Sequence, residues 1–264
     1  MDTGTPKMIA KVEGGIGWMI FNQPEKRNAV AFEMWKAIPR IIEAFEADPA
    51  VRGIVIAGAG DKAFVSGADI SEFEKLRSTP EDVKIYNAAG DHAAAVIQAA
   101  TKPTIAMIRG ICIGGGLGMA LNTDIRICSD DSVFAVPAAR LGLGYRYGGM
   151  KRLVDVVGPS YAKEIFFTAR KFTPAEALAM GLVNRVVPVA NLESYVKDYT
   201  SRIAENAPLT MKAAKMAIEA VTHDESKRNL KAVNDMVDVC FGSEDYIEGR
   251  RAFMEKRKPQ FKGR

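Results

Sequence analysis

A run of three glycines, Gly114–Gly116, follows a short β-type segment and opens a segment with the composition of a helix. The backbone N–H groups at the start of a helix lie at the positive end of its dipole and can bind a negatively charged oxygen. Because glycine has no side chain, a ligand atom can approach this backbone closely. The run is therefore a candidate for stabilising an oxyanion. Tight packing between a strand and a helix is the alternative explanation of the three glycines.

A second loop with similar properties, Phe64–Ile70, also follows a predicted strand and contains a flexible glycine at position 67. Two backbone donors from two separate loops are what the enolate oxygen of a thioester requires. The two loops together favour oxyanion chemistry over simple packing. The nearest carboxylates, Asp69 and Glu72, are expected to cap a helix that starts near Ser71.

Other catalytic patterns are weak or missing. Gly58, Gly60 and Ala63 match a loose dinucleotide pattern, but the residues that follow do not form the helix that such a site requires. The chain has no phosphate-binding P-loop, no G-x-S-x-G nucleophile motif and no H-E-x-x-H metal pair. The two histidines, His92 and His223, fall in polar helical segments, where surface roles are expected. We therefore expect no metal and no nicotinamide cofactor.

The composition indicates a chain that buries a large core, since 48% of its 264 residues are hydrophobic. The net charge is +4, and the basic residues are densest over residues 250–264. Few aromatic residues accompany them, so a solvated helix end or a local phosphate site is expected there rather than nucleic-acid binding. The three cysteines show no disulfide framework, and no apolar stretch reaches 18 residues. These features predict a soluble cytoplasmic protein with no membrane partner.

Apolar runs and predicted helices alternate along the first part of the chain, which indicates an α/β fold with mostly parallel strands. The expected strands are 9–12, 16–21, 51–57, 104–108 and 125–128. The expected helices in this part are 31–47 and 80–100. From residue 173 onward the pattern is chiefly helical, over 174–180, 192–206, 209–221 and 225–239. Residues 206–208 are a predicted hinge.

Several motifs, in order along the chain, resemble those of the enoyl-CoA hydratase/isomerase (crotonase) family. They are the loop 22–29 (NQPEKRNA), residues 64–70 (FVSGADI), residues 102–116 (KPTIAMIRGICIGGG), residues 123–125 (TDI), residues 141–142 (LG), residues 172–183 (FTPAEALAMGLV) and residues 249–261 (GRRAFMEKRKPQF). The similarity extends almost from end to end. It implies an α/β, crotonase-like spiral of ββα turns over residues 1–201. It also implies a helical region over 202–264 that builds a homotrimer or a dimer of trimers.

The resemblance also implies which residues form the site. The backbone N–H groups of Ala68 and Gly115 would form an oxyanion hole for the thioester. The substrate is an acyl-CoA, so coenzyme A is part of the substrate and no separate cofactor is implied. Residues implied to bind the CoA moiety are Lys26, Arg27, Ala29, Ala68, Asp69, Ile70, Phe253 and Lys256. Phe253 and Lys256 would approach the CoA of a neighbouring subunit.

The chain departs from the family pattern at the catalytic acids. Hydratases of this family carry two glutamates, and the matching positions here are Gly118 and Ala138. Position 118 lies three residues after Gly115 on the same helix, so the two positions face the same side. General acid–base catalysis by such groups contributes roughly 10²–10⁴-fold to the rate. Ordinary hydration by two glutamates is therefore not expected.

Tyr145 matches the tyrosine of the methylmalonyl-CoA decarboxylase branch of the family. A phenol can hydrogen-bond to a substrate carboxylate or protonate a carbanion, and Arg140 or Arg146 could hold the carboxylate. Packing of Tyr145 against the sheet, and surface roles for both arginines, are the simpler alternatives. Three functions stay open: an enoyl-CoA hydratase/isomerase-type lyase, a decarboxylase or C–C-cleaving lyase that uses Tyr145, and a non-catalytic acyl-CoA-binding subunit.

Overall fold

The computed structural model describes residues 1–264, and its largest sheet has six strands in the order β1-β2-β3-β5-β7-β9. These strands are β1 (Met8–Glu13), β2 (Ile16–Phe21), β3 (Gly53–Gly58), β5 (Thr104–Ile108), β7 (Ile125–Ser129) and β9 (Arg185–Val187). Only β1 and β2 pair antiparallel, and every other neighbouring pair is parallel. The predicted α/β class with mostly parallel strands is confirmed.

A smaller parallel sheet has the order β4-β6-β8 and consists of β4 (Ala63–Val65), β6 (Ile111–Ile113) and β8 (Val133–Ala135). Each of the pairs β3–β4, β5–β6 and β7–β8 places its first strand in the large sheet and its second in the small one. A helix follows each pair: α3 (Pro80–Ala99), α4 (Gly115–Leu121) or α5 (Tyr147–Thr168). The chain thus repeats a ββα turn, as the predicted spiral requires.

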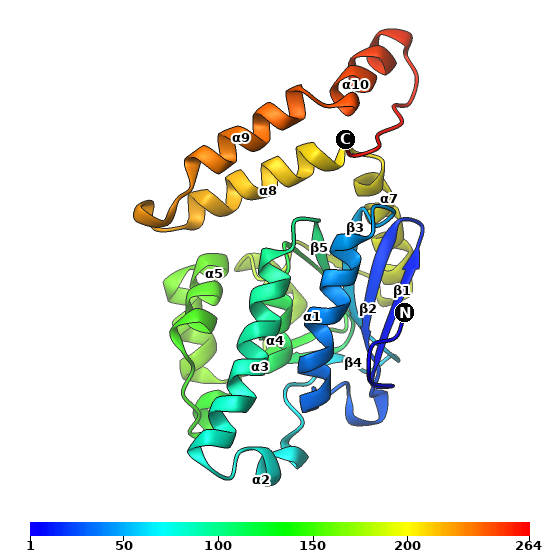
Figure 1. The fold of residues 1–264 in the computed structure, drawn as a ribbon. Coiled ribbons are helices and arrows are strands. Elements are labelled where there is room, and N and C mark those ends of the chain that lie inside the picture. Colours follow the sequence, from blue (N-terminus) through cyan, green and yellow to red (C-terminus); the bar gives the residue numbers. More distant parts are fainter.

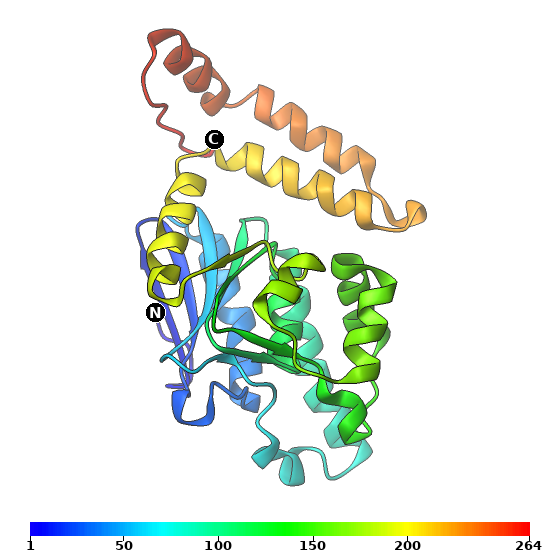
Figure 2. The same cartoon turned by 180° about the vertical axis from the view of Figure 1, so that it is seen from behind.

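Helices cover both faces of the large sheet (Figures 1 and 2). Helices α1 (Phe32–Ala47) and α3 lie on one face, and α7 (Leu192–Ala204) packs on the other against β3, β5 and β7. Because side chains of a strand alternate between faces, Ile54 and Ile56 join the larger core while Val55 joins the smaller core beneath α7. This double burial explains why β3 is an unbroken apolar run.

The C-terminal helices form an arm that projects from the spiral (Figure 1). Helices α8 (Pro208–Thr222) and α9 (Leu230–Phe241) pack side by side, and α10 (Glu244–Glu255) follows. An ion pair of 2.7 Å between Lys215 and Asp124 ties α8 to the core. The predicted hinge at 206–208 falls where α7 has ended and α8 begins. The expected boundary between the spiral and the helical region, after residue 201, lies inside α7. This boundary stays a prediction, and so does trimerisation.

Some elements differ from the sequence-based expectation. The helix expected over 225–239 is a 3₁₀ turn, Glu225–Lys227, followed by α9. Helices α5 and α10 were not predicted. In α5, Gly158 has a φ of 76° and precedes Pro159, so a kink interrupts the helical pattern in the sequence. The remaining short helices are α2 (Phe73–Leu76) and α6 (Pro174–Ala179).

Candidate active site

The glycine run lies at the turn from β6 into α4, and its members have different roles. Gly114 has a φ of 57°, which favours glycine. A Cβ at Gly116 would overlap the carbonyl oxygen of Val65, so this residue lets α4 pack directly against the backbone of β4. A Cβ at Gly115 would make only ordinary contacts, the nearest being Ala68 N at 3.6 Å. The packing explanation therefore applies to Gly116, and Gly115 stays open to a ligand.

The backbone N–H groups of Ala68 and Gly115 belong to adjacent loops, and neither donates to an acceptor in the protein. Val30 donates to Gly67 O at 2.8 Å and accepts from Asp69 N at 3.0 Å. Because these two bonds flank Ala68, its own N–H points away from Val30. Gly115 is the first residue of α4, where an amide has no partner within the helix. Two unpaired donors thus lie side by side.

Asn28 holds the loop 22–29 against the turn between β3 and β4, a role that the sequence reasoning missed. Asn28 is fully buried. Its backbone φ is 55°, a value that asparagine tolerates better than most residues. Its Oδ1 accepts from Gln23 N at 3.0 Å. Its Nδ2 donates to Ala59 O at 2.9 Å and to Ala63 O at 2.8 Å. An asparagine in a loop was the available signal in the sequence, because asparagine tolerates positive φ and bonds to nearby backbone.

Replacing Asn28 by alanine is expected to lower the free energy of unfolding by about 2–4 kcal/mol, because three backbone groups lose their partner and two of these bonds are buried. Urea unfolding followed by circular dichroism measures this change. Asn22→Ala is the matched control, since the Asn22 amide makes one exposed hydrogen bond, to Pro6 O. Equal losses in both variants would contradict the role given to Asn28.

Lys26 and Asp69, both predicted to bind CoA, contact each other between the loop 22–29 and the loop 64–70. Lys26 Nζ lies 2.8 Å from Asp69 Oδ2 and 3.1 Å from Ser71 Oγ. Burial alone would raise the pKa of Asp69, but hydrogen bonds from Lys26 and Ser71 outweigh it and hold this pKa below its ordinary value. Asp69 Oδ1 also accepts from Ser71 N at 3.1 Å, so the expected cap is present. Glu72 instead accepts from Phe32 N, the first amide of α1.

The other loop residues predicted to bind CoA are exposed or contribute backbone. Arg27 has an exposed side chain, and its carbonyl accepts from Ser66 N at 3.1 Å. The carbonyl of Ala29 accepts from Gln23 Nε2 at 3.1 Å. The Ile70 side chain is 64% exposed and free to contact a ligand. The structure therefore brings the predicted CoA-binding residues of the loops 22–29 and 64–70 together where these loops meet.

The two positions that match the family glutamates have different surroundings. Gly118 lies inside α4, and a Cβ built there has no atom within 4 Å. Ala138 is buried in the 3₁₀ helix Pro137–Leu141 and accepts a hydrogen bond from Leu143 N. The strand β8, which precedes Ala138 in the chain, is linked to the glycine run, because Gly114 N donates to Ala135 O at 2.9 Å.

The Tyr145 ring packs edge-on against Phe166 of α5, with 4.9 Å between ring centroids, rather than against the sheet. The Tyr145 side chain is 41% exposed, and its partial burial raises the pKa of the phenol, so the hydroxyl stays protonated at neutral pH. This hydroxyl has no hydrogen-bond partner in the protein and is available to a ligand. Arg146 forms an exposed ion pair with Asp91 at 3.2 Å, and Arg140 is exposed, as the simpler alternatives expected.

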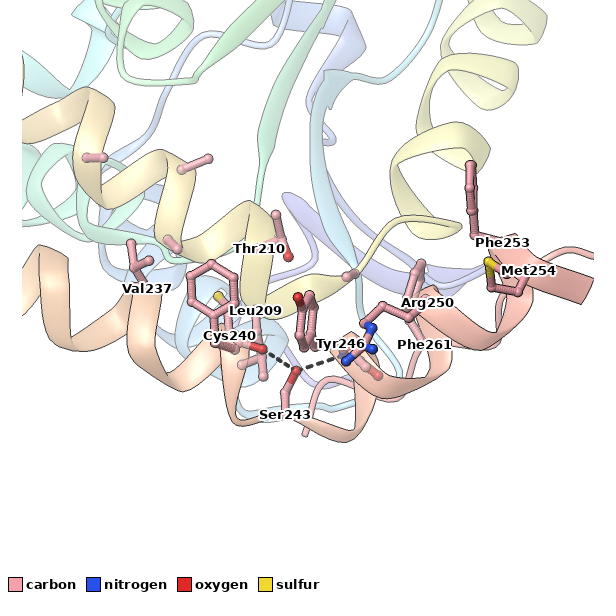
Figure 3. A pocket seen from close by; sticks show the side chains of 17 residues that line it. Leu209, Thr210, Val237, Cys240, Ser243, Tyr246, Arg250, Phe253, Met254 and Phe261 are labelled. Atoms are coloured by element: carbon pink, nitrogen blue, oxygen red, sulfur yellow. Dashed lines mark hydrogen bonds between the residues drawn. The ribbon is translucent and has the colours of Figure 1, made fainter.

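Phe253 and Lys256 lie far from the loops 22–29 and 64–70 of their own chain. Phe253 is on α10 and Lys256 directly follows it, and α10 is at the opposite end of the molecule from α2 (Figure 1). Phe253 is 81% exposed and lines an apolar groove of about 950 Å³ between α8, α9 and α10 (Figure 3). One chain alone does not join these two residues to the Lys26 loop.

Comparison with known proteins identifies the family. The model of the enoyl-CoA hydratase/isomerase family matches residues 11–264. The chain belongs to this family. A short-chain-enoyl-CoA hydratase of Clostridium acetobutylicum is 35% identical over 258 residues, which cover 97% of this chain and 98% of the relative. A crotonyl-CoA hydratase of Syntrophomonas wolfei is 34% identical over 254 residues, which cover 96% of this chain and 97% of the relative.

A solved structure of another member of the enoyl-CoA hydratase/isomerase family agrees closely. The enoyl-CoA hydratase/carnithine racemase of Magnetospirillum magneticum has a TM-score of 0.94 and 33% identity, covering 98% of this chain and 97% of that one. The predicted family and its fold are therefore confirmed. As in other family members, the expected chemistry is that of an enzyme acting on a CoA thioester.

Features of other site types are not found in this family member. No group of three His, Cys, Asp or Glu residues is placed to hold a metal ion. His92 and His223 are both exposed, as expected. All three cysteines are free. None of the helices has the length and apolar character needed to span a membrane.

Proposed function

We propose that this chain binds an acyl-CoA and stabilises the enolate of its thioester between the N–H groups of Ala68 and Gly115. The observation that carries the proposal is the pair of unpaired backbone donors on two adjacent loops. Such fixed donors stabilise developing negative charge without reorganisation, and removal of one costs roughly 10²–10³-fold in rate. The Lys26–Asp69 contact joins the loop 22–29 to the loop that carries Ala68, and Asn28 fixes the loop 22–29 to the turn between β3 and β4.

The reaction that follows does not rely on a pair of glutamates. Gly118 and Ala138 provide no carboxylate, and the two acids nearest Ala68 in the sequence are already engaged, Asp69 by Lys26 and Glu72 by Phe32 N. Hydration requires a base for the water and an acid for the α-carbon. A reaction that forms the enolate without proton removal is better served by these residues.

Decarboxylation of a malonyl-type thioester is the second candidate, and the unpartnered phenol of Tyr145 favours it. The bond from the α-carbon to the carboxylate breaks, CO₂ leaves, and the electron pair forms the enolate held by Ala68 and Gly115. The protonated phenol can hydrogen-bond to the departing carboxylate or give its proton to the α-carbon. Water then returns a proton to the phenolate.

Tyr145→Phe is expected to lower decarboxylation of methylmalonyl-CoA at least 10²-fold, the lower end of general acid catalysis. Mass spectrometry of the CoA thioesters, with crotonyl-CoA assayed in parallel, measures both reactions. Tyr161→Phe is the matched control, because Tyr161 of α5 has nearly the same exposed fraction as Tyr145, 42% against 41%. Efficient hydration of crotonyl-CoA by the wild-type protein, at a rate that Tyr145→Phe does not change, would contradict the decarboxylase hypothesis. Binding of both thioesters without turnover would favour a non-catalytic acyl-CoA-binding subunit.

We also propose that the arm of α8–α10 completes the site in a trimer or a dimer of trimers. Phe253 and Met254 are each about 80% exposed in the single chain, and they line the apolar groove. Exposed apolar patches of this kind mark association surfaces. Association would also allow Phe253 and Lys256 to reach the CoA bound to a neighbouring copy.

A further inference from the structure

A second pocket, of about 340 Å³, lies on the face of the large sheet that α7 covers. It is formed at the carboxyl ends of β3 and β5, which pair in parallel with Ala57 opposite Met107. None of the residues assigned to the acyl-CoA site lines this pocket. Its wall includes Gly58–Gly60. These residues begin the loose dinucleotide pattern, which lacks the helix that a dinucleotide site requires.

The pocket has an apolar wall and a charged rim. Trp18 and Ile20 project from β2 on the same face, since side chains two residues apart share a face of a strand. Met107 of β5 and Leu192 of α7 complete the apolar part. Trp18 is only 5% exposed, and its side chain lines this pocket.

The charged residues of the rim neutralise one another, with one exception. Glu13 pairs with Lys11 at 2.8 Å and with Lys197 at 3.3 Å, and Lys197 also pairs with Glu193 at 3.0 Å. These four residues carry two positive and two negative charges. Arg109 forms no ion pair, and it is the charge of the pocket that has no counterion.

The guanidinium of Arg109 is also poorly satisfied in hydrogen bonds. Its Nη2 donates to Val189 O at 3.5 Å, the long limit for such a bond. Its Nε is enclosed and has no partner, and its Nη1 donates to no protein atom. A partly buried cation without a counterion is costly, and a bound anion would offset that cost. Because Nε is enclosed, a ligand in the pocket would bind the accessible Nη1, which has no partner in the protein.

We propose that this pocket binds a short aliphatic monocarboxylate, with its carboxylate at Arg109 and its chain against Trp18, Ile20, Met107 and Leu192. One unmatched positive charge calls for one negative charge, and the apolar wall favours a hydrocarbon chain over a phosphate. The volume lies near the lower end of the range of roughly 300–1,000 Å³ typical of small-molecule sites. The ligand class is therefore a small fatty acid rather than a nucleotide.

Sodium hexanoate is the probe, and Trp18 fluorescence is the readout, in full-length protein that carries Trp35→Phe. The chain has two tryptophans, so this substitution leaves Trp18 alone. We expect a saturable change with hexanoate at constant ionic strength. The Kd is expected to rise at least tenfold on adding Arg109→Gln, because a hydrogen bond to a charged group is lost. Arg202→Gln is the control, since Arg202 is exposed and pairs with Asp198 on α7.

The length of the carboxylate's hydrocarbon chain provides a second test. It uses no Arg109 variant, so it does not depend on such a variant being folded. Affinity is expected to increase from acetate through butyrate to hexanoate, since each buried CH₂ adds hydrophobic stabilisation. Inorganic phosphate is expected to bind more weakly than hexanoate. Absence of a saturable response, equal affinity for acetate and hexanoate, or an unchanged Kd in a folded Arg109→Gln protein would each overturn the proposal. Displacement of hexanoate by self-association at high protein concentration would show instead that a second copy of the chain occupies the pocket.

Discussion

Replacing Gly115 by proline is expected to reduce turnover of the acyl-CoA substrate by roughly 10²–10³-fold, because it removes one of the two donors to the enolate oxygen. Proline is well accommodated at the first position of a helix, where its fixed φ is suitable and no intrahelical hydrogen bond is lost. Gly115 occupies that position in α4. The variant therefore removes an N–H group, at a cost in stability because Gly114 before it has φ 57° and ψ −116°, outside the range that proline favours in a preceding residue.

Gly115→Ala is the matched control for this prediction. It adds a Cβ with a nearest contact of 3.6 Å, to Ala68 N, and it keeps the N–H group. We expect it to retain at least tenfold more activity than the proline variant, as measured by kcat at saturating thioester. Thermal unfolding of both variants checks that they are folded. Equal activity of the proline and alanine variants would show that the Gly115 amide does not act on the oxygen.

Introducing glutamate at position 118 is expected to raise the rate of crotonyl-CoA hydration, by about 10²-fold, because it supplies a general acid–base group beside the thioester. The side chain has space, since a Cβ at Gly118 has no neighbour within 4 Å. Replacing a glycine in a helix also stabilises it, by up to about 1 kcal/mol. Loss of the enoyl absorbance measures hydration, and a rise in Tm reports the helix effect.

Gly118→Gln separates the carboxylate from the added volume. The glutamine variant is expected to share the rise in Tm but to leave hydration at the wild-type level. If wild-type protein already hydrates crotonyl-CoA rapidly, or if the glutamine and glutamate variants hydrate it equally, position 118 does not limit the reaction. Other groups would then replace the glutamates.

Much of the fold follows from local patterns in the sequence. β2 and β3 are apolar runs because the large sheet is buried on both faces, and α1 has apolar residues at helical spacing. The break before Pro208 was readable because proline disfavours a helical residue before it. By contrast, α5 contains Gly158 and Pro159, which interrupt the pattern that defines a helix.

The candidate site was only partly accessible to sequence reasoning. The two loops were identified because glycines follow strands, and the resemblance supplied which amides face the ligand. Their adjacency depends on the pairing of β4 with β6, which brings residues nearly 50 positions apart together. The repeated ββα turn likewise leaves no repeat in the sequence, because the turns share strand pairing rather than side chains. Asn28 was missed because its three partners are backbone atoms, which no motif describes.

The most direct test of the oxyanion hole is the infrared spectrum of bound butyryl-CoA labelled with ¹³C at the thioester carbonyl. This saturated thioester reports polarisation of the carbonyl whether or not a reaction follows. We predict that the labelled C=O stretch moves to lower frequency on binding, and that Gly115→Pro returns it toward its value in water while Gly115→Ala does so less. A thioester that binds fully with an unshifted stretch in the wild-type protein would contradict the central claim.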